Sequence, residues 1–108
     1  MAHYLFQASY TPESWAGLIK NPENRGLAIA KLMESAGGKL EAFYFAFGAT
    51  DAYVIVDLPD NVAAGGVAAA VAASGGVRAL TTTVLMTSEE GEQVMRKAGE
   101  ITYSAPGG

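Results

Sequence analysis

The sequence predicts an α+β fold in which a four-stranded antiparallel sheet carries helices on one face. Four segments rich in aromatic and β-branched residues alternate with helical segments in the order β-α-β-β-α-β. Two of the helical segments end in a Gly-Gly pair that leads directly into a strand-like segment. The chain has 108 residues, of which 50% are hydrophobic and 17% charged. This length is enough for one compact domain and too short for two.

The first half of the chain is predicted to form a strand, a helical region in two pieces and a second strand. The first strand covers residues 2–10. Thr11-Pro12-Glu13 then indicates a helix start, because Thr is a good N-cap and Pro is tolerated at the first helical position. Asn21-Pro22-Glu23 repeats that signal, and the second helical piece extends to about Ala36. The second strand is expected over residues 39–47.

The second half is predicted to begin with a turn at Gly48-Ala49-Thr50 and a third strand over residues 51–58. The second and third strands should therefore form a hairpin. Pro59-Asp60-Asn61 opens a helix that ends near Ser74, and the fourth strand follows over residues 77–86.

The last predicted helix begins at Thr87-Ser88-Glu89-Glu90, which has the spacing of a capping box, and extends to about Ala98. Residues 1–100 are expected to form a single domain, with residues 101–108 as a flexible tail. The order βαββαβ plus a C-terminal helix is the ferredoxin-like split βαβ arrangement, with an expected strand order of 4-1-3-2.

Strict alternation assigns the residues of each strand to two faces. The face turned away from the helices is predicted to collect a row of large apolar side chains: Leu5, Phe43, Phe45, Phe47, Ile55, Leu80, Val84 and Met86. Exposed apolar patches of this kind usually mark an interface, so we expect a homodimer packed sheet against sheet, with higher assembly left open. The polar residues of the same face would line the space between the sheets or the mouths of the barrel: His3, Gln7, Glu41, Tyr53, Arg78 and Thr82.

Composition argues against several classes of partner and cofactor. The formal net charge is −4 and the 7 Lys and Arg residues are scattered, so no nucleic-acid partner is expected. With no Cys and a single His, we expect no thiolate zinc site, no multi-histidine metal site and no cofactor. A secretory signal and a membrane-spanning segment are not apparent, so a cytoplasmic location without membrane contact is expected.

Several short motifs follow one another in a fixed order: YLFQASYT at residues 4–11, LIKNP at 18–22 with Arg25, GGKL at 37–40, FGATD at 47–51, Pro59-Asp60, and residues 82–90. In order and spacing the chain resembles the GYD-domain family, within the dimeric α/β-barrel superfamily. The resemblance covers almost the whole chain except the tail. The Gly-Tyr-Asp signature is altered, because Thr50 stands before Asp51 where the signature has Tyr. No role of that Tyr ring is therefore carried over.

The resemblance implies a small bacterial or archaeal protein whose family has no agreed activity. Its superfamily includes cofactor-independent monooxygenases, haem-degrading enzymes, cyclases and ligand-binding domains, and the fold does not choose among them. Two hypotheses follow. The first is a homodimeric protein that binds a small apolar or aromatic molecule or forms a larger assembly. The alternative is a cofactor-independent monooxygenase-, isomerase- or cyclase-like enzyme. Its aromatic or polyketide-like substrate would lie between the sheet and the helices.

Three residues are candidates for proton transfer. His3 could be a general acid or base, a haem ligand, or a structural histidine at a strand end. Asp51 could accept a proton at a barrel mouth or hydrogen-bond backbone N–H groups of the turn, where Gly48 is expected to permit a positive φ. Tyr53 could donate to a ligand oxygen or pack at an interface.

The predicted ligand-binding residues are Gln7, Phe45, Tyr53, Arg78 and Thr82. Arg78 could hold an anionic ligand through two parallel hydrogen bonds. Glu41 and Arg78 are both expected on edge strands, where charged side chains also block unwanted strand addition.

Overall fold

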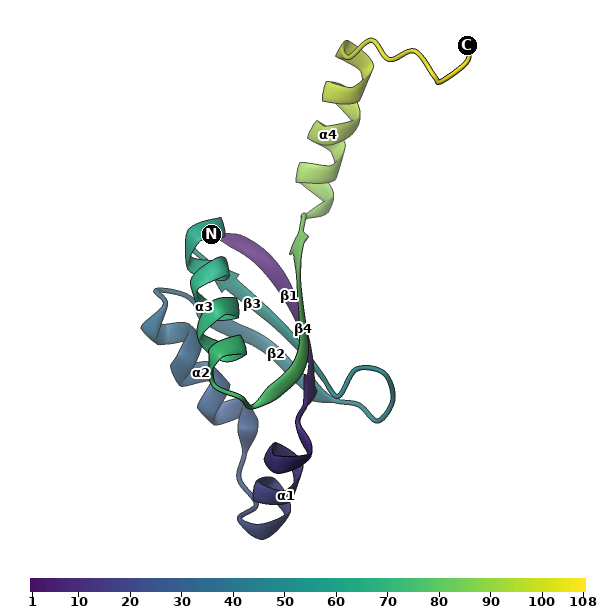
Figure 1. Cartoon of the computed structure of the whole chain (residues 1–108). Helices are drawn as coiled ribbons and strands as arrows, with labels where there is room; N and C mark the ends of the chain where they lie inside the picture. Colours follow the sequence, from purple (N-terminus) through teal and green to yellow (C-terminus); the bar gives the residue numbers. More distant parts are fainter.

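Helices cover one face of a four-stranded antiparallel sheet in the computed structural model, which describes residues 1–108 (Figure 1). The elements in chain order are β1 (Ala2–Tyr10), α1 (Pro12–Lys20), α2 (Arg25–Ser35), β2 (Lys39–Phe45), β3 (Ala52–Leu58), α3 (Asn61–Ala73), β4 (Val77–Leu85) and α4 (Ser88–Glu100). The strand order is β2-β3-β1-β4, which confirms the predicted ferredoxin-like topology and the β2–β3 hairpin.

Each helix begins at a residue whose side chain accepts a hydrogen bond from the backbone of the first turn. Thr11, Asp60 and Thr87 do this for α1, α3 and α4, as expected from the sequence. The N-cap of α2 is Asn24, three residues later than the predicted signal, because Asn21 instead ends α1.

Glycine at the end of α2 is required for two different reasons. Gly37 has a φ of 84°, a left-handed conformation that L side chains rarely adopt. At Gly38 a Cβ atom would lie 2.0 Å from the carbonyl oxygen of Asp57, so only glycine allows this close approach of the α2–β2 connection to β3. The expectation of a positive φ at Gly48 is wrong, since the positive-φ glycines are Gly37, Gly75 and Gly107.

A bulge on each edge strand changes which side chains share a face. In β2 Leu40 pairs with Val56 and Ala42 with Ile55, which leaves Glu41 without a partner. In β4 Arg78 is skipped in the same way, because Ser9 pairs with Ala79 and Tyr10 with Val77. One extra residue moves all following side chains of the strand to the opposite face.

The predicted apolar row is therefore wrong in part. Cross-strand pairing with Val54, Ala52, Ala8 and Tyr4 places Phe43, Phe45, Leu80 and Val84 on the helix side of the sheet. Thr82, opposite Phe6, is on that side as well. Phe47 and Met86 lie beyond the ends of β2 and β4.

We call the sheet surface turned away from the helices the open face. It carries Leu5, Gln7, Tyr44, Tyr53, Ile55 and Leu85, with His3, Asp57 and the bulged Glu41 at one end. Tyr44 is 68% exposed and Tyr53 is 39% exposed. The core lies on the other side of the sheet, where Tyr4, Val56 and Leu58 are almost completely buried.

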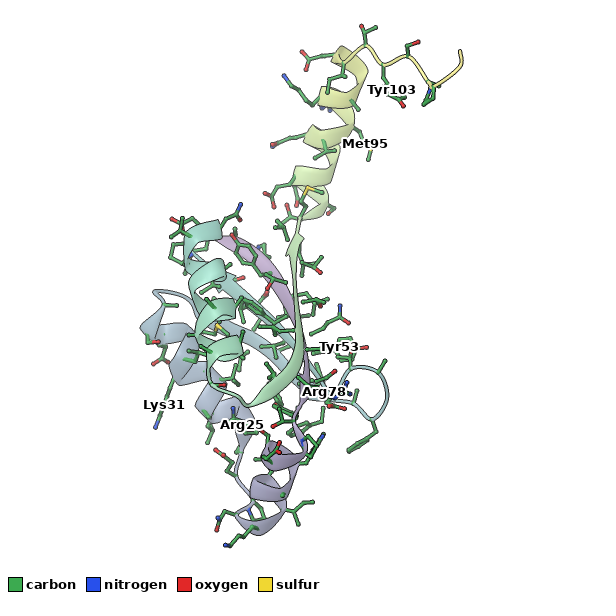
Figure 2. The ribbon with its side chains drawn as sticks, in the orientation of Figure 1. Arg25, Lys31, Tyr53, Arg78, Met95 and Tyr103 are labelled. Carbon is green, nitrogen blue, oxygen red and sulfur yellow. The ribbon has the colours of Figure 1, made fainter.

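Helix α4 projects away from the sheet and the other helices (Figure 1). The molecule measures 58 × 33 × 22 Å with a radius of gyration of 17.2 Å, whereas a globular chain of this length has about 13 Å. Apolar side chains on and after α4, among them Met95 and Tyr103, are largely exposed (Figure 2). None of the helices combines the length and apolar character needed to cross a membrane.

Candidate functional site

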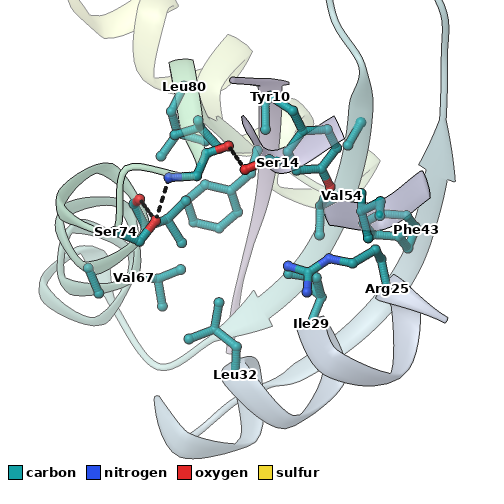
Figure 3. Close-up of a pocket in the computed structure, with 18 of the residues that line it drawn as sticks. Tyr10, Ser14, Arg25, Ile29, Leu32, Phe43, Val54, Val67, Ser74 and Leu80 are labelled. Carbon is teal, nitrogen blue, oxygen red and sulfur yellow. Dashed lines mark hydrogen bonds between the residues drawn. The ribbon is translucent and has the colours of Figure 1, made fainter. Parts of the chain in front are cut away.

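A cavity of about 620 Å³ lies between the sheet and the three helices that cover it (Figure 3). Its sheet side is formed by Phe6 and Ala8 of β1 and by Val54 of β3, among others. Ile29 and Leu32 of α2, Val67 and Val71 of α3, and Gly17 and Leu18 of α1 surround the space. The lining is mostly hydrophobic, as in pockets that bind small molecules.

The cavity exists because two helices lie over different strands and one of them has short side chains. Helix α2 packs on β2, whereas α3 packs on β4 and β3. The sequence of α3, NVAAGGVAAAVAA, has no side chain larger than Val or Asn. Because such short side chains cannot reach across to α2, the space above central strand β1 is not filled.

Arg25 is the one cationic residue that lines this cavity, and Glu23 is the one anionic residue. It is the first residue of α2, and its side chain extends into the space between α2 and the sheet (Figure 3). Its Nη1 atom lies 3.4 Å from Oε1 of Glu23, which is half exposed, so this ion pair is long and solvated. A guanidinium group has five N–H donors, and most of those of Arg25 therefore remain free for a ligand.

Hydrogen bonds between α1, α3 and the start of β4 hold another part of the cavity wall. Ser14 Oγ donates to the carbonyl oxygen of Gly76 at 2.8 Å, and the Gly76 N–H donates to Ser74 Oγ at 3.1 Å. These contacts appear as dashed lines in Figure 3. They fix the ends of α1 and α3 relative to each other, so this wall is formed without a ligand.

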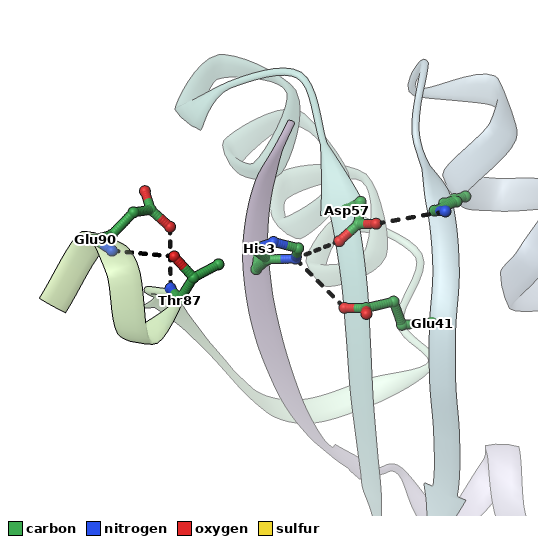
Figure 4. Close-up of polar contacts among 6 residues, drawn as sticks. His3, Glu41, Asp57, Thr87 and Glu90 are labelled. Carbon is green, nitrogen blue, oxygen red and sulfur yellow. Dashed lines mark hydrogen bonds and ion pairs between the residues drawn. The ribbon is translucent and has the colours of Figure 1, made fainter.

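A second group of polar side chains lies on the open face, away from the cavity (Figure 4). Nδ1 of His3 is 2.5 Å from Oδ1 of Asp57 and 3.4 Å from Oε2 of Glu41. Lys39 Nζ lies 3.9 Å from the other oxygen of Asp57. His3 and Asp57 face each other across β1 and β3, and the β2 bulge brings Glu41 to the same place.

The three residues predicted for proton transfer do not meet at one site. Asp51 is 7% exposed, and its Oδ2 accepts a hydrogen bond from the Tyr10 backbone N–H at 2.9 Å. The contact is structural, but it ties Asp51 to the end of β1 and not to the backbone of its own turn, as the structural alternative had expected. Tyr53 stands opposite Gln7 on the open face, and His3 lies at the end of that face. None of the three lines the cavity.

The predicted ligand-binding residues are also dispersed. Tyr53 is on the open face and Arg78 is the exposed residue of the β4 bulge (Figure 2). Gln7 is also on the open face, and Thr82 is exposed on the helix side of β4. Phe45 lines a shallow, open pocket beside Arg25 rather than the main cavity.

Sequence reasoning missed Arg25 and the apolar residues of α2 as lining of a site. A signal was present, because Arg25, Ile29 and Leu32 have the spacing of one helical face. That spacing places the Arg25 cation in the first turn of α2, on the same helical face as the apolar side chains that follow it. It does not reveal whether the space opposite the stripe is filled or hollow.

Comparison with known proteins supports both the fold and the family. A crystal structure of MtbAldR superposes with a TM-score of 0.54 at 16% sequence identity, covering 80% of this chain and 52% of that one. The likeness is one of fold, and this chain spans about half the length of that protein. No curated protein sequence matches the chain. The family model described as the GYD domain matches residues 4–95, and the chain therefore belongs to the GYD-domain family.

Proposed function

We propose that this GYD-domain protein is a homodimer in which each chain binds a small molecule with an aromatic or apolar body and one anionic group. The cavity between the sheet and the helices carries the proposal, because its lining is apolar and its one cationic side chain extends into it. Its volume of about 620 Å³ is within the range of sites that bury most of a small ligand.

The expected contributions of the two parts of the site differ in kind. Apolar contacts with Phe6, Ile29 and Val71 would bind the body of the ligand without strong preference for its chemistry. Arg25 would select for charge, since a hydrogen bond to a charged group contributes about 1.5–3 kcal/mol. That range corresponds to a roughly 10- to 150-fold preference for an anion over its neutral analogue.

The homodimer is supported by surfaces that a single chain leaves exposed. Tyr44 and Tyr53 of the open face and Met95 of α4 are 68%, 39% and 70% exposed. A helix of 13 residues has little stability in water without packing partners. Contact with a second chain would cover these side chains and leave both cavities accessible, because the cavity is on the opposite side of the sheet.

Calorimetry with a matched pair of probes tests the ligand class. We expect naphthaleneacetate to bind and its amide to bind at least tenfold more weakly. Arg25→Gln should remove that preference, because it should lower the affinity for naphthaleneacetate and leave the affinity for the amide unchanged. Arg96→Gln is the matched control, because Arg96 lies on α4 and its contact is with Glu92. Equal affinity for both probes in the native chain, or a carboxylate preference that survives R25Q, would contradict the role of Arg25.

Filling the cavity tests its location independently of charge. Ala70 and Ala69 are adjacent exposed residues of α3, and only Ala70 lines the cavity. Ala70→Phe should abolish binding of both probes, whereas Ala69→Phe should leave it unchanged. If Ala70→Phe and Ala69→Phe bind the two probes with equal affinity, the ligand does not occupy this cavity. The enzyme alternative has no specific observation in its favour, since His3, Asp51 and Tyr53 lie outside the cavity.

A further inference from the structure

We propose that His3, Glu41 and Asp57 form a binding site for a divalent transition-metal ion, with Zn²⁺ as the best-fitting probe. The site is at the end of the open face, where β1 begins, and is separate from the ligand cavity. One donor atom from each of the three residues lies within 4.8 Å of the other two. The proposal does not depend on the small-molecule function.

The backbone brings the three donors together from three neighbouring strands. His3 is the direct cross-strand partner of Asp57, so their side chains project from the same face. Glu41 belongs to an edge strand, and the bulge in β2 leaves it without a partner in the ladder. Its carboxylate is therefore free to turn toward His3, from whose Nδ1 it is 3.4 Å away. Donors bound to one zinc ion lie roughly 3.3 Å apart, a spacing that side-chain rotation alone can reach.

The surroundings of the buried Oδ1 of Asp57 also point to a ligand at this place, because its ion-pair partner is His3, itself one of the three donors. Asp57 is only 8% exposed, and its Oδ1 accepts no hydrogen bond. Nδ1 of His3 is 2.5 Å from this oxygen but without hydrogen-bond geometry. Leaving a buried carboxylate oxygen without a partner is costly. A cation bound by both residues would satisfy it, once rotation of the His3 side chain has moved Nδ1 from this oxygen to the spacing of two zinc donors.

Charge and donor type together favour a borderline divalent ion. With the imidazole neutral, the two carboxylates and the ammonium group of Lys39 leave one net negative charge around His3. One imidazole nitrogen and two carboxylate oxygens match the mixed N/O donor sets that bind Zn²⁺. Mg²⁺ prefers oxygen donors and gives up its water reluctantly, so it should bind this site poorly.

Because the chain has a single His, the imidazole ¹⁵N signals of the full-length protein belong to His3 alone. On titration with ZnCl₂ at neutral pH in a non-chelating buffer, we expect the Nδ1 resonance to shift and saturate at one ion per chain. Calorimetry should give the same stoichiometry. MgCl₂ at the same concentrations should change neither measurement.

Variants of the two more exposed ligands keep the test independent of folding. Glu41→Gln and His3→Gln should each lower Zn²⁺ affinity at least tenfold, whereas Glu34→Gln, an exposed residue of α2, should not. Asp57→Asn should do the same if it folds. The proposal is overturned if Zn²⁺ does not saturate below millimolar concentration, or if binding persists in E41Q or H3Q. Either result would leave the cavity and its ligand unaffected.

Discussion

Glu41 and Arg78 illustrate how a single inserted residue changes the surface of a sheet. Each is the unpaired residue of a bulge on an edge strand, and each is charged and exposed. A bulge interrupts the row of free backbone N–H and C=O groups, and a charge at that position discourages a further strand. The same two bulges turn Phe43 and Leu80 toward the core. Core packing and edge protection therefore have a common local cause.

At the same scale, the start of α4 should respond to acid. The Thr87 backbone N–H donates to the carboxylate of Glu90, and with the Thr87 side chain it lowers the pKa of Glu90 below its ordinary value of 4.5. A folded-state pKa that is lowered stabilises the folded form above pH 4.5, and this stabilisation is lost as the pH falls through the lower value. We expect the protection of the amides in the first turn of α4, measured relative to their intrinsic exchange rates, to fall in that window.

Glu90→Gln keeps an oxygen acceptor at the cap but has no carboxyl group to titrate. The protection of its amides should therefore show no such step, whereas Glu100→Gln, at the other end of α4, should behave as the native chain does. A step of equal size in E90Q would mean that another group controls the acid response.

At the scale of elements, α3 combines two helix-weakening glycines with a position that determines the cavity. Gly65 and Gly66 occupy its middle, and both are exposed, with open space where a Cβ atom would lie. Gly in a helix interior costs about 1 kcal/mol relative to Ala. The helix is held instead by Ala64 and Val67, which are buried in the core. Its short side chains provide the close contact with the sheet and also the space beside it.

Gly65→Ala and Gly66→Ala should each raise the free energy of unfolding by about 1 kcal/mol. For a domain of this size the corresponding rise in Tm is about 4–8 °C. Calorimetric melting of the two variants measures this rise in Tm. Probe binding should be unchanged, because neither residue lines the cavity.

Gly38→Ala is the contrasting variant, since its methyl group would collide with the Asp57 carbonyl and lower Tm. A fall in Tm for the α3 variants would show that α3 has further neighbours at these positions.

At the scale of the whole molecule, the elongated shape is what the proposed homodimer would explain. Helix α4 extends from the end of β4, and the open face presents Leu5, Tyr53 and Ile55 in a band across the middle strands. Sheet-to-sheet packing in a two-fold dimer would bury this band symmetrically. The open face is more polar than strict alternation along each strand predicted. Phe43, Phe45, Leu80 and Val84 were expected on this face but lie on the helix side of the sheet.

Light scattering at micromolar concentration should give a mass of twice 11.2 kDa. Tyr53→Arg, which introduces a charge at the centre of the open face, should shift the mass toward one chain. Ile19→Arg is the control, because Ile19 is 76% exposed on α1 and outside that face. A native chain that remains monomeric would contradict the dimer, and a Y53R variant of unchanged mass would place the contact elsewhere.

The sequence determined the elements, their order and the family, because the signals involved are local. Thr11, Asp60 and Thr87 cap helices through atoms three residues away, and the Gly-Gly pairs mark helix ends in the chain itself. Pairing of β2 with β3 followed from the turn signal at Gly48-Ala49-Thr50, although the connection in the structure, residues 46–51, is longer than that turn.

Only the tertiary structure decided which side chains share a face and where space remains. A bulge shifts register by one residue, and its position depends on the partner strand, so the faces of Phe43 and Leu80 could not be derived from alternation within their own strands. The cavity beside Arg25 depends on the distance between α2 and α3, two helices that do not adjoin in sequence. The contact of His3 with Asp57 likewise joins residues far apart in the chain, and only folding brings them together.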